Sequence, residues 1–135
     1  MESIGKEEQE LMFKFNIFEQ QIKSIQEQLQ AVEQAIIEAT SLKFGLDELK
    51  DSKEKDVLAS IGKGIFIKSK ITSEDLIVDV GGRNFVKKTI SETQKIINDQ
   101  IEKLERIKQE LEEKLEEINT EITKTFMSAQ KKSKK

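Results

Sequence analysis

The chain has 135 residues, 36% of them hydrophobic and 36% charged, and its 26 acidic and 23 basic side chains give a formal net charge of −3. The mixture of both signs argues against a nucleic-acid partner, and no apolar run is long enough to cross a bilayer, so we expect no membrane partner either. Cysteine and histidine are absent, and with no nucleotide motif we predict no enzyme, no cofactor and no metal site, in a cytoplasmic protein.

Residues 1–50 are expected to form a long helix that begins after Gly5. Apolar residues recur there at spacings of four and three, at Leu11, Phe15, Phe18, Ile22, Ile25, Leu29, Val32, Ile36 and Ala39. This 3.5-residue repeat is typical of a helix held along one face against a partner helix. The chain also has no proline, which would interrupt such a helix.

Residues 51–88 change to the pattern of β-strands. Four short runs are expected to be strands: Val57–Ile61, Ile65–Ile71, Leu76–Val80 and Arg83–Lys88. Glycines lie between the first two runs and between the last two, and Gly81-Gly82 is a signal for a two-residue hairpin turn, which needs positive φ at both positions. The centre is therefore predicted to form two β-hairpins.

Residues 89–129 are predicted to form a second long helix, with Thr89 or Ser91 as its N-cap and with Thr89 and Glu92 spaced as a capping box. Its seam is Ile90, Gln94, Ile97, Ile101, Leu104, Lys108, Leu111, Leu115, Ile118, Ile122 and Thr125. Because its length matches that of the first helix, we expect the two to fold back as an antiparallel coiled coil. Residues 130–135 hold four lysines and are predicted to be a disordered solubilising tail or, alternatively, a docking tail for an acidic partner.

The fold class is thus α+β, a two-helix coiled coil with two hairpins inserted at its bend. Isolated hairpins bury little surface and leave open edges, so we expect these strands to pair between subunits. The apolar strand residues are interpreted as platform core and subunit interface rather than a ligand pocket: Ile65, Phe66, Ile67, Leu76, Val78, Val80 and Phe85.

This layout resembles the alpha-class subunits of prefoldin. The local resemblance is carried by residues 57–68, VLASIGKGIFIK, and by residues 78–82, VDVGG, which are similar to the family's strand-glycine-strand core and V-x-V-G turn. Beta-class subunits have a single hairpin, so two hairpins indicate the alpha class. The resemblance covers essentially the whole chain and implies that the strands join other subunits in a β-barrel platform.

The resemblance also implies a function. Prefoldins are ATP-independent holding chaperones of the cytosol, typically hexamers of two alpha-class and four beta-class subunits, which carry unfolded client polypeptides to a group II chaperonin. The expected partners are therefore beta-class subunits, unfolded clients and a chaperonin.

Apolar residues gather near both chain ends, which antiparallel pairing would bring together. The residues predicted to bind clients at this tip are Met12, Phe13, Ile17, Phe18, Phe126 and Met127. Contiguous exposed apolar patches mark interaction sites, and methionine suits promiscuous surfaces. The alternative is that these side chains only cap the end of a fraying coiled coil.

Two other functions remain open at this point. The same fold could form a homo-oligomer or filament through its hairpin edges, without a beta-class partner. It could also be a coiled-coil scaffold or an enzyme accessory factor, although the sequence shows no specific docking surface for that role.

Overall fold

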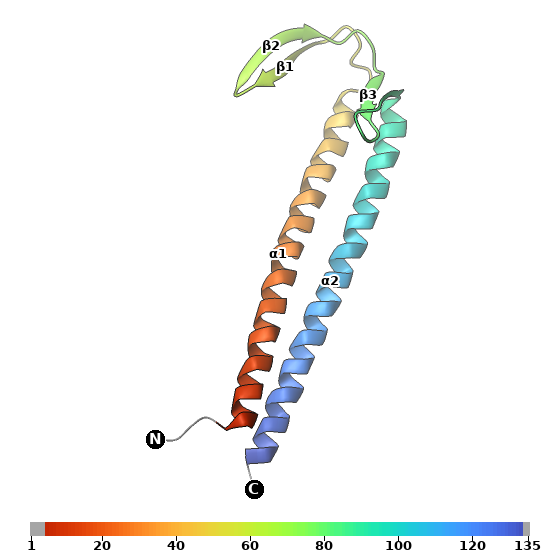
Figure 1. Cartoon of the computed structure of the whole chain (residues 1–135). Helices are drawn as coiled ribbons and strands as arrows, with labels where there is room; N and C mark the ends of the chain where they lie inside the picture. The colour runs from red at the N-terminus through yellow and green to blue at the C-terminus, as the bar shows by residue number, and fades with distance from the viewer. Residues whose placement is uncertain (1–4, 134–135) are drawn as a thin grey trace. The chain divides into compact units, whose positions relative to one another are not determined.

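The computed structural model describes residues 5–133, and their side chains as far as Lys131. In chain order the elements are helix α1 (Lys6–Glu48), strands β1 (Asp56–Gly62), β2 (Ile65–Lys70), β3 (Leu76–Asp79) and β4 (Phe85–Lys88), and helix α2 (Ile90–Ser133) (Figure 1). The prediction of two long helices around two hairpins is confirmed. The elements pack as two compact units, one of residues 1–35 and 104–135 and one of residues 36–103.

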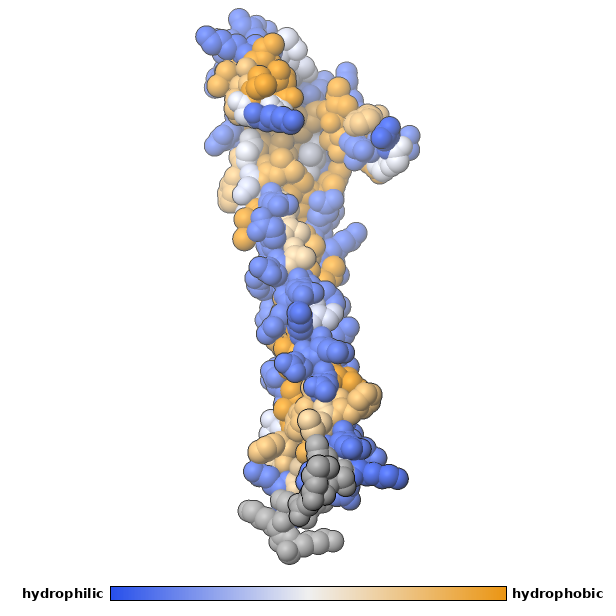
Figure 2. Space-filling model, turned by 60° about the vertical axis from the view of Figure 1, so that its left-hand side comes forward, coloured by the Kyte–Doolittle hydropathy of each residue, from blue (hydrophilic) through white to orange (hydrophobic). Residues whose placement is uncertain are grey.

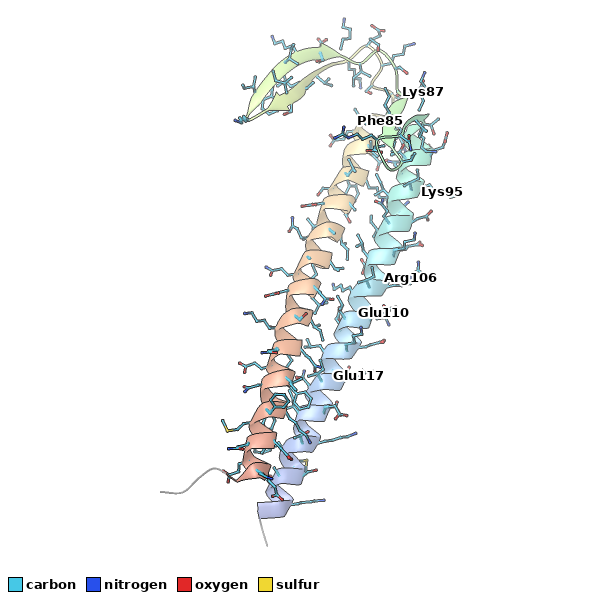
Figure 3. The ribbon with its side chains drawn as sticks, in the orientation of Figure 1. Phe85, Lys87, Lys95, Arg106, Glu110 and Glu117 are labelled. Carbon is cyan, nitrogen blue, oxygen red and sulfur yellow. The ribbon has the colours of Figure 1, made fainter. Side chains whose placement is uncertain are left out.

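The first unit, called the terminal unit below, contains the start of α1 and the end of α2. Every seam residue predicted in these segments is buried or half-buried, and Ile25 and Leu111 are the most deeply buried, each 7% exposed. Charged residues occupy the opposite side, and Arg106, Glu110 and Glu117 lie on the side of α2 that faces away from α1 (Figure 3). The heptad pattern therefore sorts the side chains as expected.

The second unit, called the hairpin unit below, has its core where the helices approach the hairpins. Leu46 of α1 and Ile90 and Ile97 of α2 form the buried cluster, and Ala39, Leu49, Leu76 and Ile101 pack against it. Leu76 is the contribution of β3, so the second hairpin is anchored to the helices by an apolar contact. Burial of this kind contributes about 25 cal/mol per Å² of apolar surface.

The two hairpins are separate two-stranded antiparallel sheets. In the first, Lys63 and Gly64 form the turn, both with positive φ, and the register shifts between Ser60 and Gly62. In the second, the prediction of a two-residue turn at Gly81-Gly82 was wrong in length. Arg83 also has a positive φ of 63°, and the Asn84 N–H donates to the Gly81 carbonyl at 3.0 Å. Three residues with positive φ, Gly81, Gly82 and Arg83, thus lie between Val80 and Asn84, whose backbones are joined by a hydrogen bond.

Hydrogen bonds close the ends of the helices. Thr89 is the N-cap of α2, since its Oγ1 accepts from the Glu92 N–H at 3.1 Å, as the capping box predicts. After α1, the buried Ser52 donates from its hydroxyl to the Leu49 carbonyl, and its N–H donates to Glu74 Oε1 at 3.2 Å. The link from Ser52 to Glu74 ties the end of α1 to the segment before β3.

Helix α2 continues through residues 130–133, which were predicted to belong to a disordered or docking tail. Lysine and glutamine are good helix formers, and cations are favoured at the negative end of the helix dipole. The last two lysines, Lys134 and Lys135, lie outside the described residues, as do residues 1–4.

Candidate functional site: an apolar tip and two exposed hairpins

The terminal unit ends in an open groove where the start of α1 meets the end of α2. The groove has a volume of about 620 Å³. Its apolar lining comes from Leu11 and Phe15 of α1 and from Phe126 and Ala129 of α2. Residues more than 100 positions apart in the sequence thus line one cavity, as the antiparallel prediction requires.

Five large apolar side chains of the same two helix ends are exposed, and of these Phe126 also lines the groove. Phe13 is 66% exposed, Met12 57%, Met127 55% and Phe126 53%, while Ile17 is 38% exposed. These residues lie at helix positions beside or opposite the seam, so the packing of α1 on α2 does not cover them. Hydrophobic residues accordingly interrupt the hydrophilic surface of the terminal unit (Figure 2).

Phe18 differs from the other predicted tip residues. It is half-buried on the seam, and its ring meets that of Phe15 edge-on, with centroids 6.3 Å apart and an interplanar angle of 63°. Edge-to-face pairs of this kind stabilise packing. Phe18 therefore contributes first to the coiled coil, and its exposed neighbours are better placed to bind another chain.

Charged side chains form the rim of the groove. Glu7, Glu8, Glu10 and Lys14 come from α1, and Lys124 comes from α2. Phe13 lines a second, smaller cavity of about 330 Å³ with Lys6, Gln9, Glu10 and Lys14. A polar rim around apolar side chains is the arrangement that marks an interaction surface in a protein that stays soluble.

The first hairpin exposes apolar residues on both of its faces. The register places Ala59 opposite Ile67 and Val57 opposite Ser69 on one face, with Leu58 opposite Lys68 and Ser60 opposite Phe66 on the other. Ile65, Phe66 and Ile67 are each more than half exposed, and so are Leu58 and Ile61. A two-stranded sheet with two uncovered apolar faces needs a partner.

The second hairpin separates its residues by face. Leu76 and Val78 are half-buried, and Leu76 packs against the core of its own unit. Ile77 is 74% exposed and Phe85 62%, on the face that also carries Lys87. Figure 3 shows Phe85 and Lys87 on this hairpin. Val80, beyond β3, is 55% exposed.

The sequence interpretation missed several exposed strand residues: Val57, Leu58, Ile61, Ile77 and Val86. The signal for them is a break in the alternation of apolar and polar residues, because Leu58 and Ile77 are apolar and so are their neighbours in sequence. Runs without alternation predict burial on both faces. In this chain both faces of the first hairpin and the Ile77 face of the second are uncovered.

Among residues 5–133, no cluster of three or more acidic, histidine or cysteine side chains could hold a metal ion. In the same range no helix is both long and apolar enough to cross a membrane.

The polar contacts of the hairpin unit are structural: Gln94 Nε2 donates to Asp47 Oδ1 at 2.7 Å, and Lys50 Nζ lies 3.2 Å from the same oxygen. The Gln94 hydrogen bond, followed by that from Lys50, holds the pKa of Asp47 below its ordinary value.

Comparison with known proteins decides the family. The prefoldin subunit family model matches residues 18–135 of the chain. The chain belongs to the prefoldin family. Its similarity to prefoldin subunit alpha of Methanosphaera stadtmanae is 32% identity over 97 residues, covering 72% of this chain and 70% of that protein. The same subunit of Methanobrevibacter smithii is 30% identical over 103 residues, covering 70% of each chain.

These relatives confirm the alpha class, and the prefoldin fold agrees with a solved structure. A filamentous prefoldin from Methanocaldococcus jannaschii superposes with a TM-score of 0.77 at 21% identity, covering 85% of this chain and 97% of that one. The chain is therefore a chaperone-family subunit of the alpha class. Its two hairpins are the feature from which that class was predicted.

Proposed function

We propose that this alpha-class prefoldin subunit is an ATP-independent holdase that captures non-native polypeptides at the tip of its terminal unit and delivers them to a group II chaperonin in the cytoplasm. The observation that carries the proposal is the exposure of large apolar side chains at the ends of the two helices, with Phe13 66% and Phe126 53% exposed and Phe126 also lining the terminal groove. An unfolded client offers apolar side chains to such a surface. Covering both sets stabilises the complex by about 25 cal/mol per Å².

The chemistry of the tip suits many clients. Met12 and Met127 are flexible and polarizable, so they adapt to side chains of different shape. Groove binding by one subunit is expected to be weak, since a few apolar contacts must offset the ordering of a mobile chain. Several subunits in one assembly would raise the effective affinity by about 10²- to 10⁴-fold through avidity.

The hairpins supply the assembly in this proposal. Exposed Ile65, Ile67, Val80 and Phe85 pair with beta-class subunits in a barrel-like platform that holds two alpha-class and four beta-class chains, and Phe66 lies on the other face of its hairpin. The half-buried Leu76 and Val78 support the hairpin from inside the chain's own unit. Catalysis has no part in this mechanism, because holding requires binding and release alone.

A second candidate function is a homo-oligomer or filament with the same capture surface. The observation that favours it is the superposition on a filamentous prefoldin, together with two hairpins whose apolar faces are uncovered. In this arrangement copies of the chain occupy the positions of the beta-class partner.

The first experiment measures native mass by light scattering, for the chain alone and after mixing with a beta-class subunit. A discrete hexamer that forms only on mixing supports the first proposal, and long polymers of the chain alone support the second. The same samples are then added to a denatured model enzyme as it is diluted into buffer without nucleotide. Aggregation as fast as without the protein would overturn the holdase proposal in either form.

A further inference from the structure

An apolar stripe runs along the outside of α1 in the hairpin unit. Ile37 is 59% exposed and Phe44 63%, and they lie seven residues, or about two helical turns, apart on one side of the helix. Leu46 of the same helix packs in the core, so the stripe lies on another side. Between its two large members are the half-buried Thr40 and the exposed Ser41. Their side chains are short and leave room for a large side chain from a partner.

The stripe ends in negative charge. Glu48 is exposed one turn beyond Phe44, and the last turn of α1 contains no basic residue. The nearby Lys50 is engaged with Asp47, with 3.2 Å between Nζ and Oδ1. The end of the helix adds the negative pole of its dipole. A partner for this surface should therefore combine a large apolar side chain with a basic one.

One face of the first hairpin has that composition. Phe66 and Leu58 lie on the same face as Lys68 and Lys70, as the pairs Ser60 with Phe66, Leu58 with Lys68 and Asp56 with Lys70 require. Phe66 is 57% and Leu58 65% exposed. The opposite face carries Val57, Ala59 and Ile67 and no charge among them, which suits a β platform better.

We propose that the Phe66 face of the hairpin of a second copy of this chain docks on the α1 stripe. Phe66 then covers Thr40 and Ser41 in the space between the two large stripe residues, and its ring meets the methyl group of the threonine. Lys68 pairs with Glu48. The spacings agree, since Phe66 and Lys68 are about 6.6 Å apart along the strand. Ser41 and Glu48 are about 10.5 Å apart along the helix, a difference that the flexible lysine side chain spans.

This contact joins two different surfaces, so a pair of copies keeps one free hairpin and one free stripe. A head-to-tail contact of this kind closes into a ring or continues as an open filament. It is additional to strand pairing, because it leaves the Ala59 and Ile67 face of the hairpin uncovered. The inference stands apart from client capture, which uses the terminal unit.

The absence of cysteine from these 135 residues makes the contact testable by cross-linking in the whole chain. A Ser41→Cys variant is mixed with a Phe66→Cys variant of different mass and oxidised, and the mixed disulfide dimer is quantified. We expect at least about a tenfold excess over the matched pair Ser41→Cys with Ile67→Cys, because Ile67 is adjacent in sequence but lies on the other face. Equal yields from the two pairs would overturn the proposal.

A charge exchange tests the same contact without a covalent bond. Glu48→Lys and Lys68→Glu should each weaken self-association by about two- to fivefold at low salt, the range for exposed ion pairs. In an equimolar mixture the two variants can alternate. The unaltered Lys68 of one then meets the unaltered Glu48 of the other, and the two substituted side chains, which also have opposite charges, meet at the next contact. Sedimentation should therefore show the mixture associating as the unaltered chain does. A mixture as weakly associated as either variant alone would contradict the assignment.

Discussion

Gln94 of α2 donates a hydrogen bond from Nε2 to Oδ1 of Asp47 on α1 over 2.7 Å, although 47 positions separate the two residues. Gln94 takes a seam position between Ile90 and Ile97, where an apolar residue would pack as readily. Its Nε2 also approaches the Lys43 carbonyl at 3.4 Å. A shift of one helix along the other would break these bonds, so Gln94 favours a single register within the hairpin unit.

The Asp47 contact makes stability depend on pH in a defined direction. Hydrogen bonds from Gln94 and Lys50 lower the pKa of Asp47 from its ordinary value of 3.8. The ionised group therefore stabilises the folded state above pH 3.8, and this contribution is lost as the pH falls through the lower folded-state pKa. We expect Asp47→Asn to unfold at lower urea concentration than the unaltered chain at neutral pH, with a difference that shrinks well below pH 3.8.

The control for this prediction is Asp99→Asn, which removes the same charge from an exposed position of the hairpin unit. Both proteins are compared at one protein concentration, since association shifts apparent stability. A deficit of equal size at both pH values would show that Asp47 acts through something other than its charge.

Two glycines should respond to alanine in opposite ways. Gly45 is inside α1, and a Cβ added there would meet nothing within 4 Å. Gly45→Ala should raise the free energy of unfolding by about 0.5–1 kcal/mol because it restricts the unfolded chain. Gly82 has a φ of 58° in the turn of the second hairpin, so Gly82→Ala should lower it by about 1–2 kcal/mol. Denaturant titration of the pair would contradict this account if both changes had the same sign.

The cap of α2 provides a third test. Thr89 Oγ1 accepts the Glu92 N–H and donates to Glu92 Oε1, both at 3.1 Å. Thr89→Ala should therefore cost about 1 kcal/mol of stability, while Thr89→Ser keeps the hydroxyl and should cost less. If serine and alanine were equally destabilising in thermal unfolding, the loss would belong to the threonine methyl group and not to the cap.

Most of the architecture could be read from the sequence because each part carries a local signal. The seams of the two helices, from Leu11 to Ala39 and from Ile90 to Thr125, follow a 3.5-residue repeat. Every predicted seam residue is buried or half-buried. The length of the second hairpin's turn could not be predicted, because Arg83 has a positive φ that is uncommon for arginine. Arg83 takes that conformation inside the turn that the hydrogen bond between Val80 and Asn84 closes.

The candidate surfaces were predicted less completely, for a different physical reason. Exposure depends on which face of an element finds a partner, and sequence pattern alone did not distinguish the inward Leu76 from the outward Ile77. Ile37 and Phe44 were missed because single apolar residues off a seam are common on surfaces. They become informative when the structure places them on one side of α1 next to Glu48.

The tip can be tested apart from assembly. Phe13, Ile17 and Phe126 are exposed in the terminal unit, so changing all three to serine should leave the fold and the native mass unaltered. The three side chains supply much of the apolar area open to a client, and their loss should weaken client holding by at least about tenfold. Ile107→Ser, an exposed apolar change on α2 of the same unit, compares with Phe13→Ser as a matched single control. Suppression of aggregation by the triple variant at the unaltered level, in an assembly of the same mass, would mean that these side chains only cap the coiled coil.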